Sequence, residues 1–496
     1  MPVGVAVTCD LRTTRCRAKQ FTPAGDFFPS VVLLAILTGR CALLNSRRQV
    51  LFTLVVALCL VLLVACGGSS SNNNQQPPVT VSIASAPANI GAGANWQYSA
   101  TVSGSSNQTV TWTATGGGTI DSTGLYIAPT TVPTSPTVTI SAQSAAAASA
   151  STSTTVTVQA NDPLGSATGT AMTCPTFAGG IPADQSACYQ VNISCDGVAD
   201  FSAYVKVNQP AGAPIGTVIL GTGTGGSALY DYDNPVFFSS DGTVNGGLAV
   251  VNALLNSGFT TAQVTFGAPF NTSNSAGWLT GPGGVRRLAC RYATLAQWIY
   301  SNVHNSTTIP LCATGNSGGA GAIAYALTDY GLDSIFAMVE ATSGPPMSRL
   351  DAACVPASQC QTANFTCNPG DPTETIHMCY ANSESQIIDP AYSQPICTNA
   401  LNGTAAPSGL LLSDSVLGGP ARTFSNTYVN VVVGGQDTSS AVDQALTWYA
   451  ALTNTSKNQA CVSDAPHPIP SVQDGAQRIA SDIQNLCKLP AKAAAK

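Results

Sequence analysis

Charge is what this chain has least of. Of its 496 residues only 8% are Asp, Glu, Lys or Arg, whereas globular proteins average about 25%. The formal net charge is −6, and no cluster of Lys and Arg occurs after residue 50. Nucleic-acid binding needs such a cluster to neutralise phosphates, so nucleic acid is not an expected partner. The apolar share of 44% is enough for a large buried core.

The chain also lacks any Cys-x-x-Cys pair, although it has 17 cysteines. A single histidine, His377, lies among the later ones, which disfavours a zinc site. Even numbers of cysteines in an exported chain form disulfides. We therefore expect no bound metal and up to six disulfides among the twelve cysteines after residue 170. These are Cys174, Cys188, Cys195, Cys290, Cys312, Cys354, Cys360, Cys367, Cys379, Cys397, Cys461 and Cys487.

An apolar run from Val50 to Ala65 follows two arginines near the N-terminus. The run is shorter than the roughly 20 residues of a bilayer span and fits the core of a secretory signal. It ends in Leu-Val-Ala-Cys at 63–66, which resembles the lipobox of bacterial lipoproteins. The resemblance implies acylation of Cys66 and a lipid anchor in the cell envelope. A plain membrane-anchor helix is the alternative.

The rest of the N-terminal part divides by composition. Residues 1–65 are assigned to an extension and the signal, 66–78 to a polar low-complexity tether, and 159–170 to a second linker. Between the linkers, residues 79–158 hold short β-branched segments spaced by Gly, Asn, Ser or Pro. Such spacing is typical of an all-β sandwich, and the stretch resembles bacterial Ig-like domains. We expect it to act as a spacer or adhesive module.

From residue 171 to 490, strand-like and helix-like segments alternate. This alternation predicts the α/β class, with a mostly parallel sheet covered by helices on both faces. An irregular stretch, residues 343–426, interrupts the pattern and holds five of the cysteines. We interpret it as a disulfide-tied cap over the functional site.

One motif in this part carries chemistry. Strand-like residues 309–315 run directly into Gly-Asn-Ser-Gly-Gly at 315–319, and a helix-like segment follows. Gly-x-Ser-x-Gly between a strand and a helix is typical of the nucleophile elbow, whose strained turn presents the Ser hydroxyl at a helix N-terminus. Small neighbours are needed because larger side chains would clash in that turn. The motif therefore predicts Ser317 as a nucleophile.

A Ser hydroxyl needs a base to take its proton, and the chain has only three histidines. His304 ends the helix-like segment before the nucleophile strand, where a solvated position is expected. His377 lies among cysteines in the irregular stretch. His467 lies in a loop ahead of the final helix, which is where this chain order presents its base. We predict His467 as the base, with His377 as the second candidate.

An acid that orients the base is expected between the serine and the histidine. Asp437 directly follows the strand-like residues 428–435. It would lie at the carboxyl edge of the sheet, where open α/β folds place their ligands. We predict Asp437 as the acid, and Glu340, at the end of the preceding strand, is its rival.

The chain order Ser317, Asp437, His467 is the order of the α/β-hydrolases, and residues 185–490 resemble that superfamily in strand order as well. The resemblance implies a serine hydrolase that forms an acyl-enzyme, and it implies no cofactor. Within the superfamily, tannases and feruloyl esterases place a Cys beside both the serine and the histidine. This chain has Asn316 beside the serine, so no nearer family is assigned.

The same resemblance implies an oxyanion hole of two backbone N–H groups. One would come from Gly318 and the other from the glycine-rich residues 221–226, with Gly223, Thr224 and Gly225 as candidates. The His-Gly-Gly-Gly motif that many lipases carry there is absent. These residues also match Gly-x-Gly-x-x-Gly, but no helix-like segment follows, so a dinucleotide is not expected.

Aromatic residues near the same edge of the sheet, Tyr230 and Trp278 among them, would either line an acyl or aryl pocket or belong to the core. Three functions stay open at this point. An ester hydrolase is preferred because esters are the commonest substrates of the superfamily, by analogy alone. A peptidase or amidase would use the same three residues. A non-catalytic adhesin would not need the intact set of Ser317, Asp437 and His467.

Overall fold

The structure is a computed structural model. It describes residues 5–10, 15–20 and 77–489, except 85, 178, 233–236, 241, 243–244, 268–269, 271–275, 408, 419–422 and 454–455. The predicted signal and Cys66 lie outside the described residues. Strands β1 (Val5–Asp10) and β2 (Arg15–Gln20) pair antiparallel in a unit separate from Pro77–Lys496. Within the described residues, no helix combines the length and the apolar character that crossing a membrane requires.

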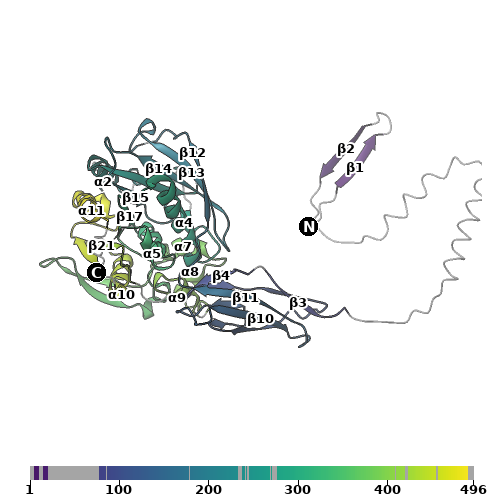
Figure 1. The fold of residues 1–496 in the computed structure, drawn as a ribbon. Helices are drawn as coiled ribbons and strands as arrows, with labels where there is room; N and C mark the ends of the chain where they lie inside the picture. The colour runs from purple at the N-terminus through teal and green to yellow at the C-terminus, as the bar shows by residue number, and fades with distance from the viewer. Residues whose placement is uncertain are drawn as a thin grey trace, which may run out of the picture. The chain divides into compact units, whose positions relative to one another are not determined.

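Residues 80–159, here called the β-region, form three small sheets with the strand orders β4-β11-β10-β7, β5-β9-β8 and β3-β6 (Figure 1). Along β10, Val138, Ile140 and Ala142 are buried and alternate with more exposed residues, as the two-residue period of a strand requires. The strands are β3 (Thr80–Ile83), β4 (Asn89–Gly91), β5 (Asn95–Gln97), β6 (Ala100–Ser103), β7 (Val110–Thr115), β8 (Thr119–Ile120), β9 (Leu125–Ile127), β10 (Thr137–Ser144) and β11 (Ser151–Gln159).

A nine-stranded sheet forms the rest of the unit, in the order β12-β13-β14-β16-β15-β17-β18-β21-β22. The six strands from β16 to β22 in this order run parallel, and β12, β13 and β14 pair antiparallel with their neighbours. This confirms the α/β class. The strands are β12 (Ser166–Met172), β13 (Ala187–Ser194), β14 (Phe201–Asn208), β15 (Gly216–Gly221), β16 (Phe259–Phe266), β17 (Leu311–Asn316), β18 (Met338–Thr342), β21 (Tyr428–Gly434) and β22 (Lys457–Val462).

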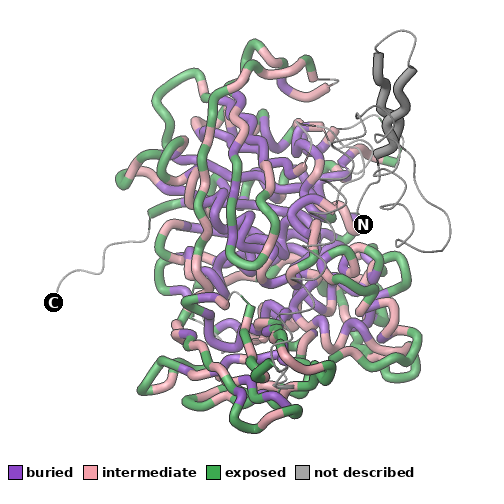
Figure 2. Tube along the Cα trace, turned by 90° about the vertical axis from the view of Figure 1, so that its right-hand side faces the viewer, coloured by how far each residue is buried: buried purple, intermediate pink, exposed green. Residues whose placement is uncertain are grey.

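Helices cover both faces of this sheet (Figure 1). On β15, Val218 and Leu220 pack with helices α2 (Gly246–Asn256) and α11 (Gln473–Leu486). Ile219, between them, faces the other side, because successive strand residues point to opposite faces. That side is covered by α4 (Cys290–Ile299), α5 (Gly318–Thr328) and α10 (Ala441–Ala451). Buried residues accordingly fill the interior of the molecule (Figure 2).

The irregular residues 343–426, called the cap, hold short helices and a two-stranded hairpin. The helices are α6 (Leu350–Ala353), α7 (Asn382–Ile388), α8 (Ile396–Leu401) and α9 (Leu410–Asp414), and the hairpin strands are β19 (Thr362–Thr366) and β20 (Thr373–His377). Residues from α7 and from the segment that follows β18 line the cavity described below.

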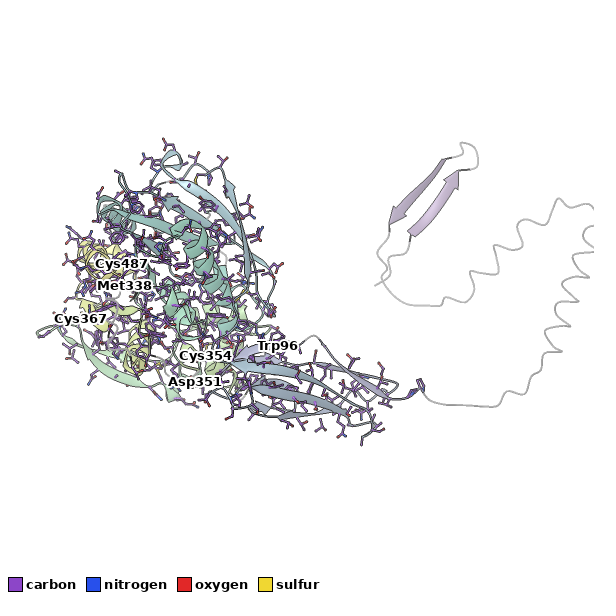
Figure 3. The ribbon with its side chains drawn as sticks, in the orientation of Figure 1. Trp96, Met338, Asp351, Cys354, Cys367 and Cys487 are labelled. Atoms are coloured by element: carbon purple, nitrogen blue, oxygen red, sulfur yellow. A yellow bond between two sulfur atoms is a disulfide. The ribbon has the colours of Figure 1, made fainter. Side chains whose placement is uncertain are left out.

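All twelve cysteines after residue 170 are paired, which confirms the six expected disulfides. Such bonds persist in oxidising compartments outside the cytoplasm, which is consistent with an exported protein. One of them joins β17 to the end of α11, and Figure 3 labels Cys487 there. The pairs are Cys174–Cys188, Cys195–Cys290, Cys312–Cys487, Cys354–Cys397, Cys360–Cys379 and Cys367–Cys461.

The β-region contacts the large sheet domain through polar groups that are almost fully buried. Arg286, in helix α3 (Val285–Leu288), donates to the Ala92 carbonyl at 3.0 Å and lies 2.6 Å from Asp162, whose carboxylate accepts from the Gly91 N–H at 2.9 Å. The Asn95 side chain donates to Asp414 of the cap at 2.6 Å. Because a buried charge is costly without its partner, these pairs hold the β-region in one position on the domain.

Candidate active site

The sharp turn predicted around Ser317 is present. Strand β17 ends at Asn316, α5 begins at Gly318, and Ser317 lies between them with φ 53° and ψ −115°. A positive φ at a residue other than glycine costs on the order of 1–3 kcal/mol. The surrounding backbone maintains it, since the Ser317 N–H donates to the Thr342 carbonyl at 2.8 Å. A Cβ at Gly319 would lie 2.7 Å from the Thr222 carbonyl oxygen, so only glycine fits there.

The glycine-rich turn after β15 approaches this elbow closely. A Cβ added at Gly318 would overlap the carbonyl oxygen of Thr224, and one added at Gly223 would lie 3.5 Å from the Ser317 Cβ. Thr224 itself has a φ of 52°. Of the four residues predicted for the oxyanion hole, Gly223 therefore lies against Ser317, and Thr224 lies against Gly318. Gly225 packs instead on Ala276.

The predicted acid and base are in direct contact. His467 lies in the loop after β22, and its Nδ1 is 2.9 Å from Asp437 Oδ2 and 3.1 Å from Ser439 Oγ. The Ser439 hydroxyl and N–H both donate to the other Asp437 oxygen, at 2.7 and 2.9 Å. Asp437 accepts from Nδ1–H, which leaves Nε2 as the proton acceptor of the ring.

These contacts set the charge of the acid. Burial of Asp437 acts to raise its pKa, but the hydrogen bonds from His467 and Ser439 outweigh burial and lower the pKa below its ordinary value. The carboxylate therefore stays ionised and can stabilise an imidazolium at His467.

Asn316 connects the elbow to the loop that carries His467. Its Oδ1 accepts from the Ile469 N–H at 3.3 Å and from the Thr342 hydroxyl at 3.1 Å. Ile469 follows His467 by two residues, so the side chain beside the nucleophile also restrains the base.

Ser317 and His467 line one cavity of about 460 Å³. Its floor is the elbow and the glycine-rich turn, and its far wall is the cap. The cap side is mostly apolar, and Glu384 is the single carboxylate among the described lining residues. The other lining residues are Thr222, Gly223, Thr224, Ser227, Ala228, Asn316, Gly318, Pro346, Met347, Tyr380, Ile387, Ile388, Ser439 and Ala441.

Tyr230 and Trp278, for which the sequence left open a place in the substrate pocket or in the core, both lie in the core. Tyr230 is 0% and Trp278 is 1% exposed, and both belong to buried clusters of the core. Tyr230 packs on Phe237 with ring centroids 4.8 Å apart, and Trp278 packs on Tyr325 at 6.3 Å. Position on a loop near the sheet edge does not tell which way a ring points, so the sequence could not separate the two outcomes.

The rival acid, Glu340, is also placed apart from His467. It is fully buried within β18, where its oxygens accept from Thr314 at 3.2 Å and from Asn430 at 2.8 Å. Burial, together with the nearby Asp482, raises the pKa of Glu340 well above its ordinary value. A carboxyl that stays protonated is a poor partner for an imidazolium.

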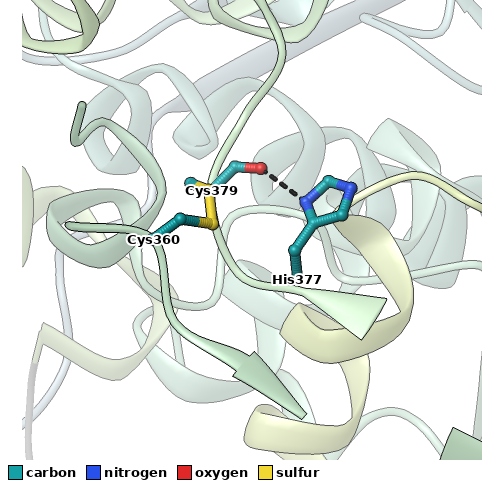
Figure 4. A group of neighbouring side chains, drawn as sticks. All are labelled: Cys360, His377 and Cys379. Atoms are coloured by element: carbon teal, nitrogen blue, oxygen red, sulfur yellow. Dashed lines mark hydrogen bonds between the residues drawn. A yellow bond between two sulfur atoms is a disulfide. The ribbon is translucent and has the colours of Figure 1, made fainter. Parts of the chain in front are cut away.

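The second candidate base, His377, ends strand β20 (Figure 4). Its Nδ1 lies 2.9 Å from the Cys379 carbonyl oxygen and its Nε2 lies 3.2 Å from the Thr438 carbonyl oxygen. Cys360, His377 and Cys379 form the one close group of metal-ligand types found in the described residues. Because the two sulfurs are bonded to each other, they offer no thiolate. His304 is buried and lies 3.0 Å from the Thr217 hydroxyl, not at a solvated helix end.

Comparison with known proteins gives likeness only at the level of structure. No family model and no curated protein matches the chain. A putative hydrolase from Agrobacterium vitis S4 is 12% identical, with a TM-score of 0.37 over 61% of this chain and 99% of that chain. A dienelactone hydrolase from Anabaena variabilis ATCC 29413 is 14% identical, with a TM-score of 0.34 over 62% and 100%.

The esterase domain of a Rhodothermus marinus protein is 10% identical, with a TM-score of 0.33 over 60% of this chain and 96% of that one. In all three comparisons the similarity covers almost the whole of the solved structure but leaves over a third of this chain unmatched. The site described above therefore stands on its own geometry.

Proposed function

We propose that this protein is a serine hydrolase that cleaves carboxylic esters through an acyl-enzyme on Ser317. The observation that carries the proposal is the contact of 2.9 Å between His467 Nδ1 and Asp437, in a cavity that His467 shares with Ser317. A strained serine, an oriented imidazole and a buried carboxylate are the groups that acyl transfer requires.

In the proposed reaction, Ser317 Oγ attacks the ester carbonyl while His467 Nε2 takes its proton. The backbone N–H of Gly318 and one from Gly223 or Thr224 would stabilise the oxyanion. The imidazolium then gives its proton to the leaving alcohol. Water, activated by the same imidazole, releases the acid and restores Ser317.

The cap indicates which acyl groups would fit. Pro346, Met347 and Ile388 give the cavity an apolar lining, and Tyr380 adds an aromatic ring. The carboxylate of Glu384 on the same wall would repel an anionic acyl group. We therefore expect uncharged esters with an apolar acyl chain to be preferred over half-esters of dicarboxylic acids.

The proposal places the enzyme outside the cytoplasm. Six disulfides support export. Acylation at Cys66, an anchor in the cell envelope and an Ig-like identity for the β-region rest on the sequence pattern. Metabolic labelling with a fatty acid in wild type and Cys66→Ser would test the acylation.

The test of function uses the full chain, purified in detergent, with p-nitrophenyl esters of increasing acyl length and with peptide p-nitroanilides. We expect ester turnover that falls by at least about 1,000-fold in Ser317→Ala and His467→Ala. Faster turnover of the anilides would favour a peptidase. Ester turnover that is equal in wild type and Ser317→Ala would contradict the proposal and would favour a non-catalytic binding protein.

A further inference from the structure

The hairpin of the cap contacts both loops that carry the predicted acid and base. We call residues 362–377 the strap hairpin, residues 435–440 the acid loop and residues 463–468 the base loop. The two loops follow neighbouring parallel strands, β21 and β22, and each loop is connected to the hairpin by its own set of contacts.

On the acid loop, the contact is made by His377. Its Nε2 lies 3.2 Å from the carbonyl oxygen of Thr438, and its Nδ1 lies 2.9 Å from that of Cys379. Thr438 stands between Asp437 and Ser439, the two residues that hold His467. Carbonyl oxygens only accept hydrogen bonds, and a neutral imidazole has a single N–H. The tautomer protonated at Nε2 donates to Thr438 and holds the backbone of the acid loop, whereas the Nδ1 tautomer would donate to Cys379 instead.

On the base-loop side, a disulfide joins Cys367 to Cys461, near the end of β22, and Figure 3 labels Cys367. Hydrogen bonds add to it. The Ser463 hydroxyl donates to Asp371 at 2.6 Å, and the Asn368 amide donates to Ser463 at 2.7 Å. The turn between β19 and β20 is thus attached to the start of the base loop.

The hairpin is itself anchored in the cap. A disulfide joins Cys360, before β19, to Cys379, after β20. From the cap helix α7, Glu384 accepts hydrogen bonds from the N–H and the hydroxyl of Ser440, at 3.3 and 2.9 Å. The acid loop is therefore held at Thr438 by the hairpin and at Ser440 by α7.

We propose that the strap hairpin fixes the spacing between Asp437 and His467, with His377 as a positioning residue that acts through the Thr438 carbonyl. The inference rests on the proposed function, because it assigns a role in aligning that site. A displacement of about 1 Å at a reacting group can cost about 100-fold in rate. Restraints on both loops are what such alignment needs.

The test compares three substitutions of His377 in the full chain. His377→Gln keeps an N–H near the position of Nε2, His377→Asn keeps one nearer Nδ1, and His377→Ala keeps neither. We expect kcat on a p-nitrophenyl ester to fall about tenfold in His377→Ala and His377→Asn, with KM changed less than about twofold. His377→Gln should retain most of kcat. Asn364→Ala, an exposed change on the same hairpin, is the matched control.

A second measurement is independent of turnover. The Nδ1 proton of His467 should give a downfield proton resonance in wild type because Asp437 accepts it. We expect the resonance to shift or broaden in His377→Ala and in the double variant Cys367→Ser with Cys461→Ser, and to persist in Asn364→Ala. The resonance can be measured even if the protein cleaves no ester. It therefore distinguishes a wrong proposal for the function from a wrong proposal for the strap hairpin.

Equal kcat in all three His377 variants and wild type, with an unchanged His467 resonance, would overturn the proposal. The proposal would also be overturned if Asn364→Ala lost as much kcat as His377→Ala, or if kcat fell only in proportion to the melting temperature. Either result would mean that the hairpin stabilises the fold in general and does not align the site. Should the double cysteine variant not fold, the His377 series still decides.

Discussion

The two halves of the candidate site are held by different kinds of interaction. Ser317 is positioned mainly by backbone, through a strand, a helix and glycines that no side chain could replace. Asp437 and His467 are positioned by side chains and disulfides from segments distant in sequence. A single substitution around Ser317 should therefore cause a large loss of kcat. Around Asp437 and His467, single substitutions should lower kcat by amounts that depend on which contact is removed.

Among substitutions that distinguish the two halves of the site, Asp437→Asn is expected to lower kcat the most. The amide NH2 group can donate to Nδ1, which favours the wrong tautomer of His467. The neutral amide also has no charge with which to stabilise the imidazolium. We expect kcat to fall about 10,000-fold, with the fold retained. Asp474→Asn, at an exposed carboxylate in the first turn of α11, is the control. A loss below about tenfold in Asp437→Asn would mean that Asp437 is not the orienting acid.

On the serine half of the site, Gly318→Ala should cause the next largest loss of kcat. The new Cβ would overlap the Thr224 carbonyl oxygen, so the turn that carries Gly223 and Thr224 must move. Loss of one oxyanion donor costs about 100- to 1,000-fold in kcat. In Gly321→Ala, one turn later in α5, the Cβ would lie 3.0 Å from the flexible Met347 side chain and 3.8 Å, an ordinary contact distance, from Pro346. Similar kinetics in the two variants would contradict this account of the elbow.

A smaller, graded loss is expected from Ser439→Ala. The change removes a hydroxyl that donates to Asp437 and lies 3.1 Å from His467, but it leaves the Asp437–His467 contact in place. We expect kcat to fall about tenfold, with KM unchanged. A hydrogen bond to a charged group contributes about 1.5–3 kcal/mol, and the Ser439 N–H still donates to the carboxylate. A loss as large as that of Asp437→Asn would show that Ser439 acts in the chemistry itself.

The smallest effect concerns stability and pH. Because the folded-state pKa of Asp437 is lowered, its contribution to stability is present above the ordinary pKa of an aspartate and is lost as pH falls through the folded-state pKa. The difference in unfolding free energy between wild type and Asp437→Asn should therefore shrink from pH 6 to pH 3 in urea titrations. A difference that grows toward low pH would mean that the pKa is raised.

The same contrast explains what could be predicted from the sequence. The elbow was visible because its geometry demands glycines at fixed spacing around Ser317. Alternating segments gave the parallel sheet, and the even number of cysteines gave the six disulfides. The chain order singled out His467 and Asp437 as candidates, which the structure brings into contact.

The interactions around those two side chains were not predictable. Ser439 and His377 act through contacts that form only once distant segments fold together, and neither belongs to a motif. The last strand, β22, was missed because Lys457, Asn458 and Gln459 are polar residues at the edge of the sheet. β12 was missed as well, because Ser, Ala, Thr and Gly in Ser166–Met172 give no β-branched alternation.

The most direct test of the central claim is to find where a fluorophosphonate binds covalently. The full chain would be treated with the probe, digested, and the modified peptide identified by mass spectrometry. We predict a single adduct, on Ser317, that forms far more slowly in His467→Ala. An adduct on another residue, or none on a folded protein, would contradict the assignment of Ser317 as a nucleophile activated by His467.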